Sequence, residues 1–219
     1  MPLSAVLFDM DGLLVDTEPL WLRAEHTTMA ALGGHWSAAH QVAILGSSMP
    51  HAVAYMKRLA ASDLPEADIS ALLLGSMLAE LRQAEIPPKP GALALVREVA
   101  GSGMPFALVS ASVRPIMDLV LDALARAGLP TFPVTVSGDD VTRGKPDPLP
   151  YLRAAELLGI DIGRAVVMED SANGVRAAVA AGATVVAIPH VVPIQPSQRV
   201  IVRDSLLGLK LEDLRALVS

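Results

Sequence analysis

The chain has 219 residues, a formal net charge of −6 and no cysteine, and 52% of its residues are apolar. That length fits one large domain, or a core domain with a smaller insert. The negative charge, with no stripe of Lys or Arg, argues against a nucleic-acid partner, and the absence of Cys excludes disulfide and thiolate chemistry. The N-terminus enters a strand without a secretion signal, and no apolar run reaches the roughly 18 residues of a membrane span. We therefore expect a cytoplasmic protein, without a membrane partner, that acts as a monomer.

The first half of the chain predicts one strand followed by helices. The apolar run at residues 5–8 is expected to be a buried strand. Helical spacing of apolar residues then predicts four helices, at about 20–32, 37–45, 50–61 and 66–84. Ser48 is a candidate N-cap for the third. The Pro-rich run at 87–91 predicts a stiff linker. We interpret residues 18–86 as a helical cap domain, inserted into a core domain formed by residues 1–17 and 87–219.

In the second half of the chain, predicted strands alternate with predicted helices. Strands are expected at 106–109, 134–136, 165–168, 184–188 and 200–202, and helices at 92–100, 114–127, 148–158, 172–181 and 211–218. Strands that alternate with helices imply right-handed crossovers and a parallel sheet that is covered on both faces. The sequence therefore predicts an α/β fold with a Rossmann-like parallel sheet and a small α-helical cap inserted after the first strand.

Two carboxylates follow the first strand directly. Asp9 and Asp11 are two residues apart, so in extended backbone their side chains point to the same side. Ligands of open α/β sheets bind at the carboxyl edge of the strands, where this pair is expected. Two crowded carboxylates repel each other unless a cation or a proton compensates them. Gly12 lets the chain turn tightly and approach a ligand closely.

Polar residues also follow the later strands. Ser110, with the backbone N–H groups near Ala111, can hold a phosphate oxygen after strand 106–109, whereas Ser112 is expected to be a helix N-cap. Lys145 lies between Gly144 and a proline, on a stiffened loop where its ammonium can neutralise phosphoryl charge. The alternative for Lys145 is an ordinary solvated loop residue.

A second acidic pair, Glu169 and Asp170, follows strand 165–168. Together with Asp9 these groups supply the oxygen ligands that Mg²⁺ prefers. The alternative is that Asp170 or Ser171 merely caps the next helix. Asp139 and Asp140 are expected to be mainly solvated loop acids.

These segments together resemble a known family. The runs DMDGLLVDTEPLW, Ser110 after its strand, GKPDP and EDSANGVRAAVAAG match, in order, the four motifs of the haloacid dehalogenase-like superfamily. The helical insert after the first motif resembles the cap of the β-phosphoglucomutase-like branch. The first motif looks most like that of bacterial sugar-phosphate and hexitol-phosphate phosphatases.

The resemblance implies a role for each matching residue. Asp9 would be the nucleophile that forms an aspartyl-phosphate, and Asp11 the general acid and base. Mg²⁺ would be held by Asp9, the main-chain carbonyl of Asp11, and Asp170, with Glu169 bound directly or through water. Ser110, Ala111 and Lys145 would hold the phosphoryl group. The cap would close over the site and exclude water.

Three cap positions bear on the substrate. Phosphomutases of this branch carry a His where Trp21 stands and an Arg in the loop that matches residues 46–49, and neither is present. Glu18 and Trp21 are expected to face the leaving group, although an aromatic residue at helical spacing is more often part of a core. Lys57 is the one cap Lys that could serve the Schiff-base chemistry of phosphonate hydrolases, and nothing marks it.

The leading hypothesis is a Mg²⁺-dependent phosphatase of a small phosphorylated metabolite, a sugar or sugar-alcohol monophosphate. One alternative is a β-phosphoglucomutase-like phosphomutase. The other, from a different class, is a non-catalytic regulator that binds phosphate or a protein partner. The intact acid pairs argue against this third reading, because a silent protein does not need them.

Overall fold

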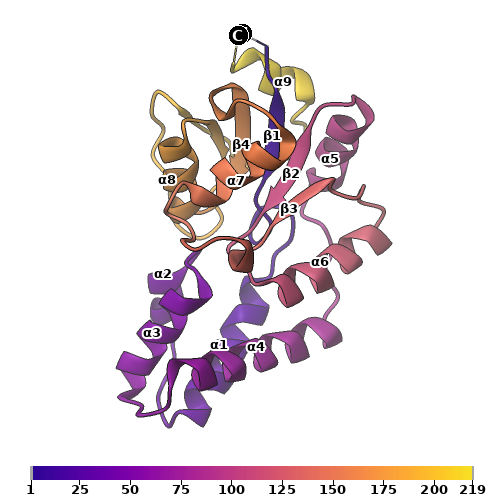
Figure 1. Cartoon of the computed structure of the whole chain (residues 1–219). Helices are drawn as coiled ribbons and strands as arrows, with labels where there is room; N and C mark the ends of the chain where they lie inside the picture. The colour runs from indigo at the N-terminus through magenta and orange to yellow at the C-terminus, as the bar shows by residue number, and fades with distance from the viewer. Residues whose placement is uncertain (1, 219) are drawn as a thin grey trace.

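A computed structural model describes residues 2–218. Its six-stranded sheet has the order β3-β2-β1-β4-β5-β6, and all the pairings between neighbouring strands are parallel (Figure 1). The strands are β1 (Ala5–Phe8), β2 (Phe106–Val109), β3 (Val134–Val136), β4 (Ala165–Glu169), β5 (Thr184–Ala187) and β6 (Val200–Val202). The first strand therefore lies in the middle of the sheet, and the predicted α/β fold is confirmed.

Strand β1 is buried on both faces. Val6 and Phe8 belong to one apolar cluster, whereas Ala5 and Leu7 belong to another, as the two-residue alternation of a strand requires. A strand between two covered faces reads as a continuous apolar run, which is what residues 5–8 show.

Helices cover both faces of the sheet. On one face lie α7 (Leu149–Leu158) and α8 (Ala172–Ala181), and on the other α5 (Ala92–Gly101), α6 (Arg114–Arg126) and α9 (Leu211–Ala216). Two 3₁₀ turns, η1 (Gly138–Asp140) and η2 (Ile162–Arg164), complete the connections after β3 and before β4. None of the helices among residues 2–218 has the length and apolar character needed to cross a membrane.

Four helices follow β1 and form what we call the helical insert: α1 (Glu18–Ala31), α2 (Ala38–Ile44), α3 (Met49–Ala60) and α4 (Glu66–Gln83). They lie beyond the carboxyl ends of β1 and β2, in the lower half of Figure 1. Helix α4 packs against α1 and α3, and also against α6 beside the sheet. The same apolar cluster runs from the sheet into the insert. The proposed domain boundaries at residues 17/18 and 86/87 stay a prediction.

The predicted elements recur with small shifts at their ends. Helix α3 begins one residue before the expected start, and Ser48 occupies its N-cap position without a side-chain hydrogen bond. Strand β4 extends one residue further than expected, to Glu169, because that residue still pairs with Ala187 in β5. Periodicity locates the body of an element, whereas its last residue depends on the neighbours that it pairs with.

The Pro-rich linker is tied to the turn after β1. The backbone N–H of Lys89 donates to the carbonyl of Leu14 at 2.7 Å, and Pro88 forms an antiparallel bridge with Val15. The two chain crossings between the sheet and the insert therefore lie side by side.

Candidate active site

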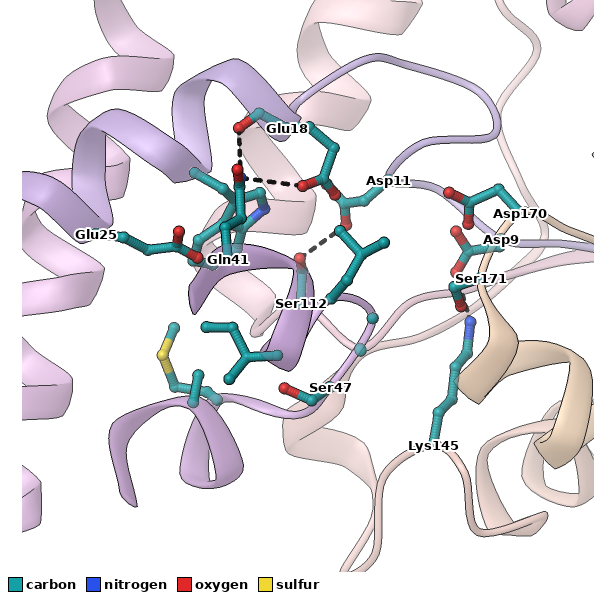
Figure 2. A pocket seen from close by; sticks show the side chains of 17 residues that line it. Asp9, Asp11, Glu18, Glu25, Gln41, Ser47, Ser112, Lys145, Asp170 and Ser171 are labelled. Atoms are coloured by element: carbon teal, nitrogen blue, oxygen red, sulfur yellow. Dashed lines mark hydrogen bonds and ion pairs between the residues drawn. The ribbon is translucent and has the colours of Figure 1, made fainter. Parts of the chain in front are cut away.

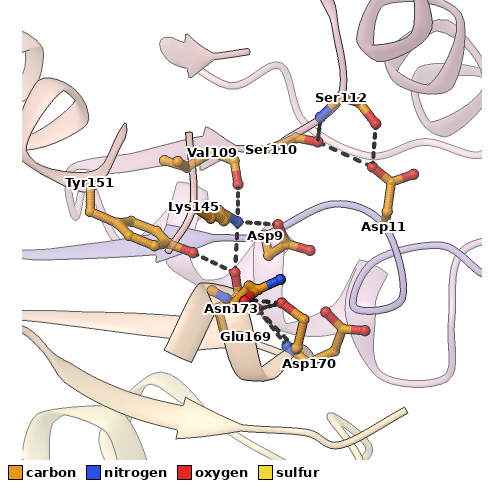
Figure 3. Close-up of polar contacts among 12 residues, drawn as sticks. Asp9, Asp11, Val109, Ser110, Ser112, Lys145, Tyr151, Glu169, Asp170 and Asn173 are labelled. Carbon is orange, nitrogen blue, oxygen red and sulfur yellow. Dashed lines mark hydrogen bonds and ion pairs between the residues drawn. The ribbon is translucent and has the colours of Figure 1, made fainter. Parts of the chain in front are cut away.

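The end of β1 brings Asp9 to a buried group of acids. One carboxylate oxygen each from Asp9, Glu169 and Asp170 lies within 4.8 Å of the others (Figure 3). Strand β4 is the neighbour of β1 in the sheet, with Phe8 opposite Met168, so their next residues meet at the same edge. The side chains expected to form a metal site are therefore together.

Lys145 lies among these acids and is only 4% exposed. Its ammonium forms ion pairs with Asp9 and with Glu169, the latter at 2.6 Å, and donates to the carbonyl of Val109 at 3.0 Å. All three donors of the ammonium are thus used. The alternative of a solvated loop lysine is wrong.

Both oxygens of Glu169 are occupied by donors of the protein. One accepts from Lys145 and from the Tyr151 hydroxyl at 2.7 Å, and the other from the backbone N–H groups of Asp170 and Ser171 at 2.9 and 3.0 Å. The Ser171 hydroxyl donates to the second oxygen as well. This carboxylate is therefore held in a fixed position.

The electrostatics of the acid group are those of buried, interacting charges. Burial, together with the charge of Glu169, raises the pKa of Asp9 well above its ordinary value. Burial and the charge of Asp9 do the same to the pKa of Asp170. Burial by itself would lower the pKa of Lys145, but Asp9 and Glu169 outweigh it and the pKa is raised. A divalent cation would relieve the remaining repulsion among the acids.

Asp11 points away from this group, toward three hydroxyls. Thr17 donates to one of its oxygens. Ser110 and Ser112 donate to the other at 3.1 and 2.8 Å (Figure 3). The expectation that Ser112 caps helix α6 is wrong, because Val113 occupies the N-cap position. The Ser112 hydroxyl is instead part of the site.

Two glycines leave room for the carboxylates. Gly12 has φ +82°, and a Cβ atom added there would lie 1.9 Å from Oδ2 of Asp170. A Cβ atom on Gly174, in the first turn of α8, would lie 1.7 Å from an oxygen of Glu169. Any larger residue at either position would displace a carboxylate of the site.

A cavity opens between these acids and the helical insert, with about 740 Å³ of space including solvent at its mouth. Its lining includes Asp9, Asp11, Lys145, Asp170, Ala111 and Ser112 from the sheet side, and Glu18, Trp21, Glu25, Gln41, Ser47 and Met49 from the insert (Figure 2). Glu18, Trp21 and Ala111 thus line the cavity, and their contact with a substrate stays a prediction. Trp21 also packs against the apolar cluster, so it belongs both to the lining and to the packing of the insert.

Three further expectations concern caps and loop acids. Ser171 does cap α8, since its hydroxyl accepts from the N–H of Gly174 at 3.1 Å, while it also contacts Glu169. Asp139 and Asp140 are exposed, but they are not merely solvated. Asp139 accepts from the backbone N–H of Arg114 at 2.7 Å, and Asp140 forms an ion pair with the same arginine.

Several residues of the site carry no local signal in the sequence. Tyr151, Glu25 and Gln41 lie within helices, where nothing in the local sequence distinguishes them. Thr17 lies inside the first motif run and Ser112 lies two residues after Ser110, and these positions are the one hint available. Tertiary packing decides which of them reach the cavity.

The donor set fits a hard divalent cation. Asp9 and Asp170 contribute carboxylate oxygens that are buried, close together and, apart from Lys145 on Asp9, without a hydrogen-bond donor among residues 2–218. Oxygen ligands of this kind suit Mg²⁺, which keeps several waters and takes few protein ligands.

Comparison with known proteins agrees with this geometry. A family model described as haloacid dehalogenase-like hydrolase matches residues 3–182. Hexitol phosphatase A of Escherichia coli is 34% identical over 196 residues, which cover 86% of this chain and 84% of the relative.

Two solved structures share the whole architecture. A variant of CbbY from Rhodobacter sphaeroides, in complex with xylulose-(1,5)bisphosphate, has a TM-score of 0.87 and 30% identity, covering 97% of this chain and 99% of that one. The β-phosphoglucomutase of Clostridium difficile has a TM-score of 0.86 at 18% identity, covers 99% and 97%, and supports the fold alone. With all four motif segments gathered at one sheet edge, the chain belongs to the haloacid dehalogenase-like hydrolase family, as one of its phosphatases.

Proposed function

We propose that this phosphatase hydrolyses a sugar or sugar-alcohol monophosphate through an aspartyl-phosphate intermediate, with Mg²⁺ as cofactor. The observation that carries the proposal is the different setting of the two aspartates at one cavity. Asp9 lies among acids and a lysine, whereas Asp11 lies among hydroxyls.

The chemistry is divided between these two residues. A carboxylate oxygen of Asp9 attacks phosphorus, and the bond from phosphorus to the leaving oxygen breaks as the new one forms. Asp11 donates a proton to the leaving oxygen. It then accepts a proton from the water that hydrolyses the aspartyl-phosphate, which returns Asp9 and releases phosphate.

Other residues position the phosphoryl group and compensate negative charge. Ser110 and the backbone N–H groups near Ala111 hold phosphoryl oxygens, and Ser110 already contacts Asp11 in the structure. Lys145 offsets negative charge at Asp9 and on the transferred group.

Mg²⁺ would be held by the carboxylates of Asp9 and Asp170 and by the main-chain carbonyl of Asp11. Because five protein donors already occupy both oxygens of Glu169, we propose that this residue acts on the metal through water. Mg²⁺ would supply charge neutralisation of the phosphoryl oxygens.

The lining of the insert supports a neutral leaving group with a single phosphate. Lys145 is the one Lys or Arg among the lining residues that the structure describes, and it lies on the sheet side. Glu18 and Trp21 offer a carboxyl acceptor and an aromatic face, which suit a hydroxylated group. A second phosphate, as in the bisphosphate bound to the CbbY variant, finds no cation here.

The test is a screen of phosphorylated metabolites with and without Mg²⁺. We expect phosphate release from hexitol and hexose monophosphates, and none after EDTA treatment until Mg²⁺ is restored. Mg²⁺ should also raise the melting temperature of the wild type more than that of Asp170→Asn, because a ligand that binds the folded state stabilises it. Formation of glucose 6-phosphate from β-glucose 1-phosphate would instead establish a phosphomutase. Phosphate binding with no turnover of any substrate would support a non-catalytic regulator.

A further inference from the structure

Glu25 lines the cavity at the end away from the acid group. It belongs to α1 in the helical insert, and Figure 2 places it at the opposite side from Asp9, Asp170 and Lys145. It is only 4% exposed. One carboxylate oxygen accepts a hydrogen bond from Nε1 of Trp36 at 2.9 Å. The other oxygen has no hydrogen-bond donor among residues 2–218.

The support for Glu25 is rigid. Trp36 is 1% exposed, and its ring packs against those of His40 and Tyr55 at centroid distances of 5.3 and 5.9 Å. A tryptophan fixed in this way presents its N–H in one direction. The carboxylate that accepts from it is therefore oriented before any ligand arrives.

Other polar groups share this end of the cavity. Gln41 donates to the main-chain carbonyl of Glu18 at 2.9 Å and to its carboxylate at 3.2 Å. The hydroxyl of Ser47, also on the lining, is buried and has no hydrogen-bond partner among the described residues. Unpaired acceptors and a free hydroxyl in one lining match a ligand that carries several hydroxyl donors.

This end of the cavity offers no cation to an anion, because the one Lys or Arg among the described lining residues, Lys145, lies at the other end. Neither Glu18 nor Glu25 forms an ion pair within residues 2–218, and burial raises the pKa of both, to about 8 for Glu18 and about 7 for Glu25. Because Glu25 lines the cavity, a ligand hydroxyl can reach the carboxylate oxygen that has no donor among residues 2–218.

We propose that Glu25, oriented by Trp36, accepts a hydrogen bond from a hydroxyl at the far end of the leaving group, and so selects polyol monophosphates long enough to reach it. The inference rests on the proposed function, whose substrate class it narrows. It makes Glu25 a specificity-determining residue that takes no part in phosphoryl transfer.

The experiment combines a substitution in the protein with a change in the substrate. Wild type, Glu25→Leu, Glu25→Gln and the control Glu66→Gln are assayed on glucitol 6-phosphate, its 1-deoxy analogue and acetyl phosphate. Glu66 is exposed in the first turn of α4 and does not line the cavity, so its variant should match the wild type.

At pH 8, above the raised pKa of Glu25, we expect the wild type to prefer the hexitol phosphate over the 1-deoxy analogue about 10- to 100-fold in kcat/KM, as for a hydrogen bond to a charged acceptor. Glu25→Leu should abolish that preference, mainly by raising KM for the hexitol phosphate. It should lower the ratio of hexitol phosphate to acetyl phosphate turnover by the same factor. Glu25→Gln should retain part of the preference for the hexitol phosphate over the 1-deoxy analogue. The coupling between the substitution of Glu25 and the removal of the substrate hydroxyl isolates the proposed contact.

The contrary outcomes are distinct. A wild type that hydrolyses both hexitol phosphates equally well overturns the inference but leaves the proposed function standing, and this measurement does not depend on whether a variant folds. A folded Glu25→Leu that keeps the preference also overturns it. A wild type without activity on any polyol or sugar phosphate overturns the proposed function, and this inference with it.

Discussion

At the scale of single residues, two aspartates two positions apart have acquired different surroundings. Asp9 lies next to Glu169, Asp170 and Lys145, where the metal ligands are expected. Asp11 lies next to hydroxyls and lines the cavity toward the insert. The first setting suits a nucleophile and the second suits proton transfer to a leaving group.

Asp9→Asn is expected to lower kcat by more than about a thousand-fold while the fold is retained, because an amide cannot attack phosphorus. The variant also removes one charge from a crowded group of acids, so its melting temperature should not fall below that of the wild type by more than a few degrees. The control is Asp118→Asn, since Asp118 is an exposed residue of α6. A folded Asp9→Asn with a tenth of wild-type activity would show that Asp9 is not the nucleophile.

Asp11→Asn is expected to affect poor leaving groups most. An alkoxide must be protonated as it leaves, whereas p-nitrophenolate leaves without help. Rapid-quench measurement of the phosphorylation step should show a loss of about 10²- to 10⁴-fold for an alkyl phosphate, and a much smaller loss for p-nitrophenyl phosphate. Equal losses for the two substrates would contradict the general-acid role.

At the level of secondary structure, the turn after β1 connects Asp9, the proposed nucleophile, to the insert. Gly12 takes a positive φ in this turn. The linker at Pro88 and Lys89 pairs with Val15 and Leu14, which follow Gly12 closely. The Lys89 ammonium donates to the Gly12 carbonyl and contacts Nδ1 of His190 at 3.0 Å. Burial lowers the pKa of Lys89, although Asp170 and Asp16 oppose the effect.

Gly12→Ala and Gly103→Ala form a matched pair of substitutions. Both glycines have positive φ, +82° and +73°, but a Cβ on Gly103 meets nothing within 4 Å whereas one on Gly12 meets Asp170. Both variants should lose about 1 kcal/mol of stability to the backbone conformation, measured by urea unfolding. Gly12→Ala alone should also lose at least a hundred-fold in kcat/KM, because Asp170 must move. Similar activity in the two variants would show that the approach of Gly12 to Asp170 does not matter.

The elements themselves could be predicted because their signals are local. Four of the six strands, β1, β2, β3 and β6, have the predicted bounds, since short apolar runs between turn residues define them. Helix α8 also has its predicted bounds, because capping residues, Ser171 and Gly182, stand at its two ends. The sequence predicts a cap at Ser112 and the structure does not have one, because a serine after a strand has the same local signal whether it caps a helix or donates to Asp11.

Across the molecule, the cavity extends from the proposed catalytic residues at the sheet edge to Glu18 and Glu25 on the insert. Glu18 and Glu25 keep raised pKa values through burial, to which the charge of Asp11 adds for Glu18. The hydrogen bond from Trp36 opposes the shift at Glu25 without cancelling it. A leaving group between the two ends therefore meets carboxyl groups that ionise only at a higher pH than usual.

These shifts predict that the protein becomes less stable as the pH rises. The folded pKa of Glu25 is about 7, against an ordinary value of 4.5. Between these values the unfolded chain releases a proton that the folded chain keeps, so the free energy of unfolding falls as the pH rises. The contribution of Glu25 is complete below about pH 4.5 and is lost above about pH 7.

Urea unfolding at pH 5 and pH 8 measures this contribution. The fall in the free energy of unfolding between the two pH values should be smaller in Glu25→Leu than in the wild type, by on the order of 2 kcal/mol. Glu66→Gln serves as the control and should keep the wild-type slope. Identical slopes in wild type and Glu25→Leu would mean that the pKa of Glu25 is not raised in the folded protein.

Short-range patterns were enough to predict the order of elements, the family and the acids at the carboxyl edge of the sheet. Each of these depends on short-range patterns: apolar runs, helical spacing, and polar residues directly after a strand. Only the tertiary structure decided that Ser112 and Thr17 hold Asp11, that Tyr151 supports Glu169, and that Trp36 orients Glu25. Thr17 and Asp11 share the loop after β1, whereas the other three contacts join residues that lie 11, 18 and 101 positions apart in the chain. The packing of whole helices brings such partners together, and the local sequence of neither partner encodes it.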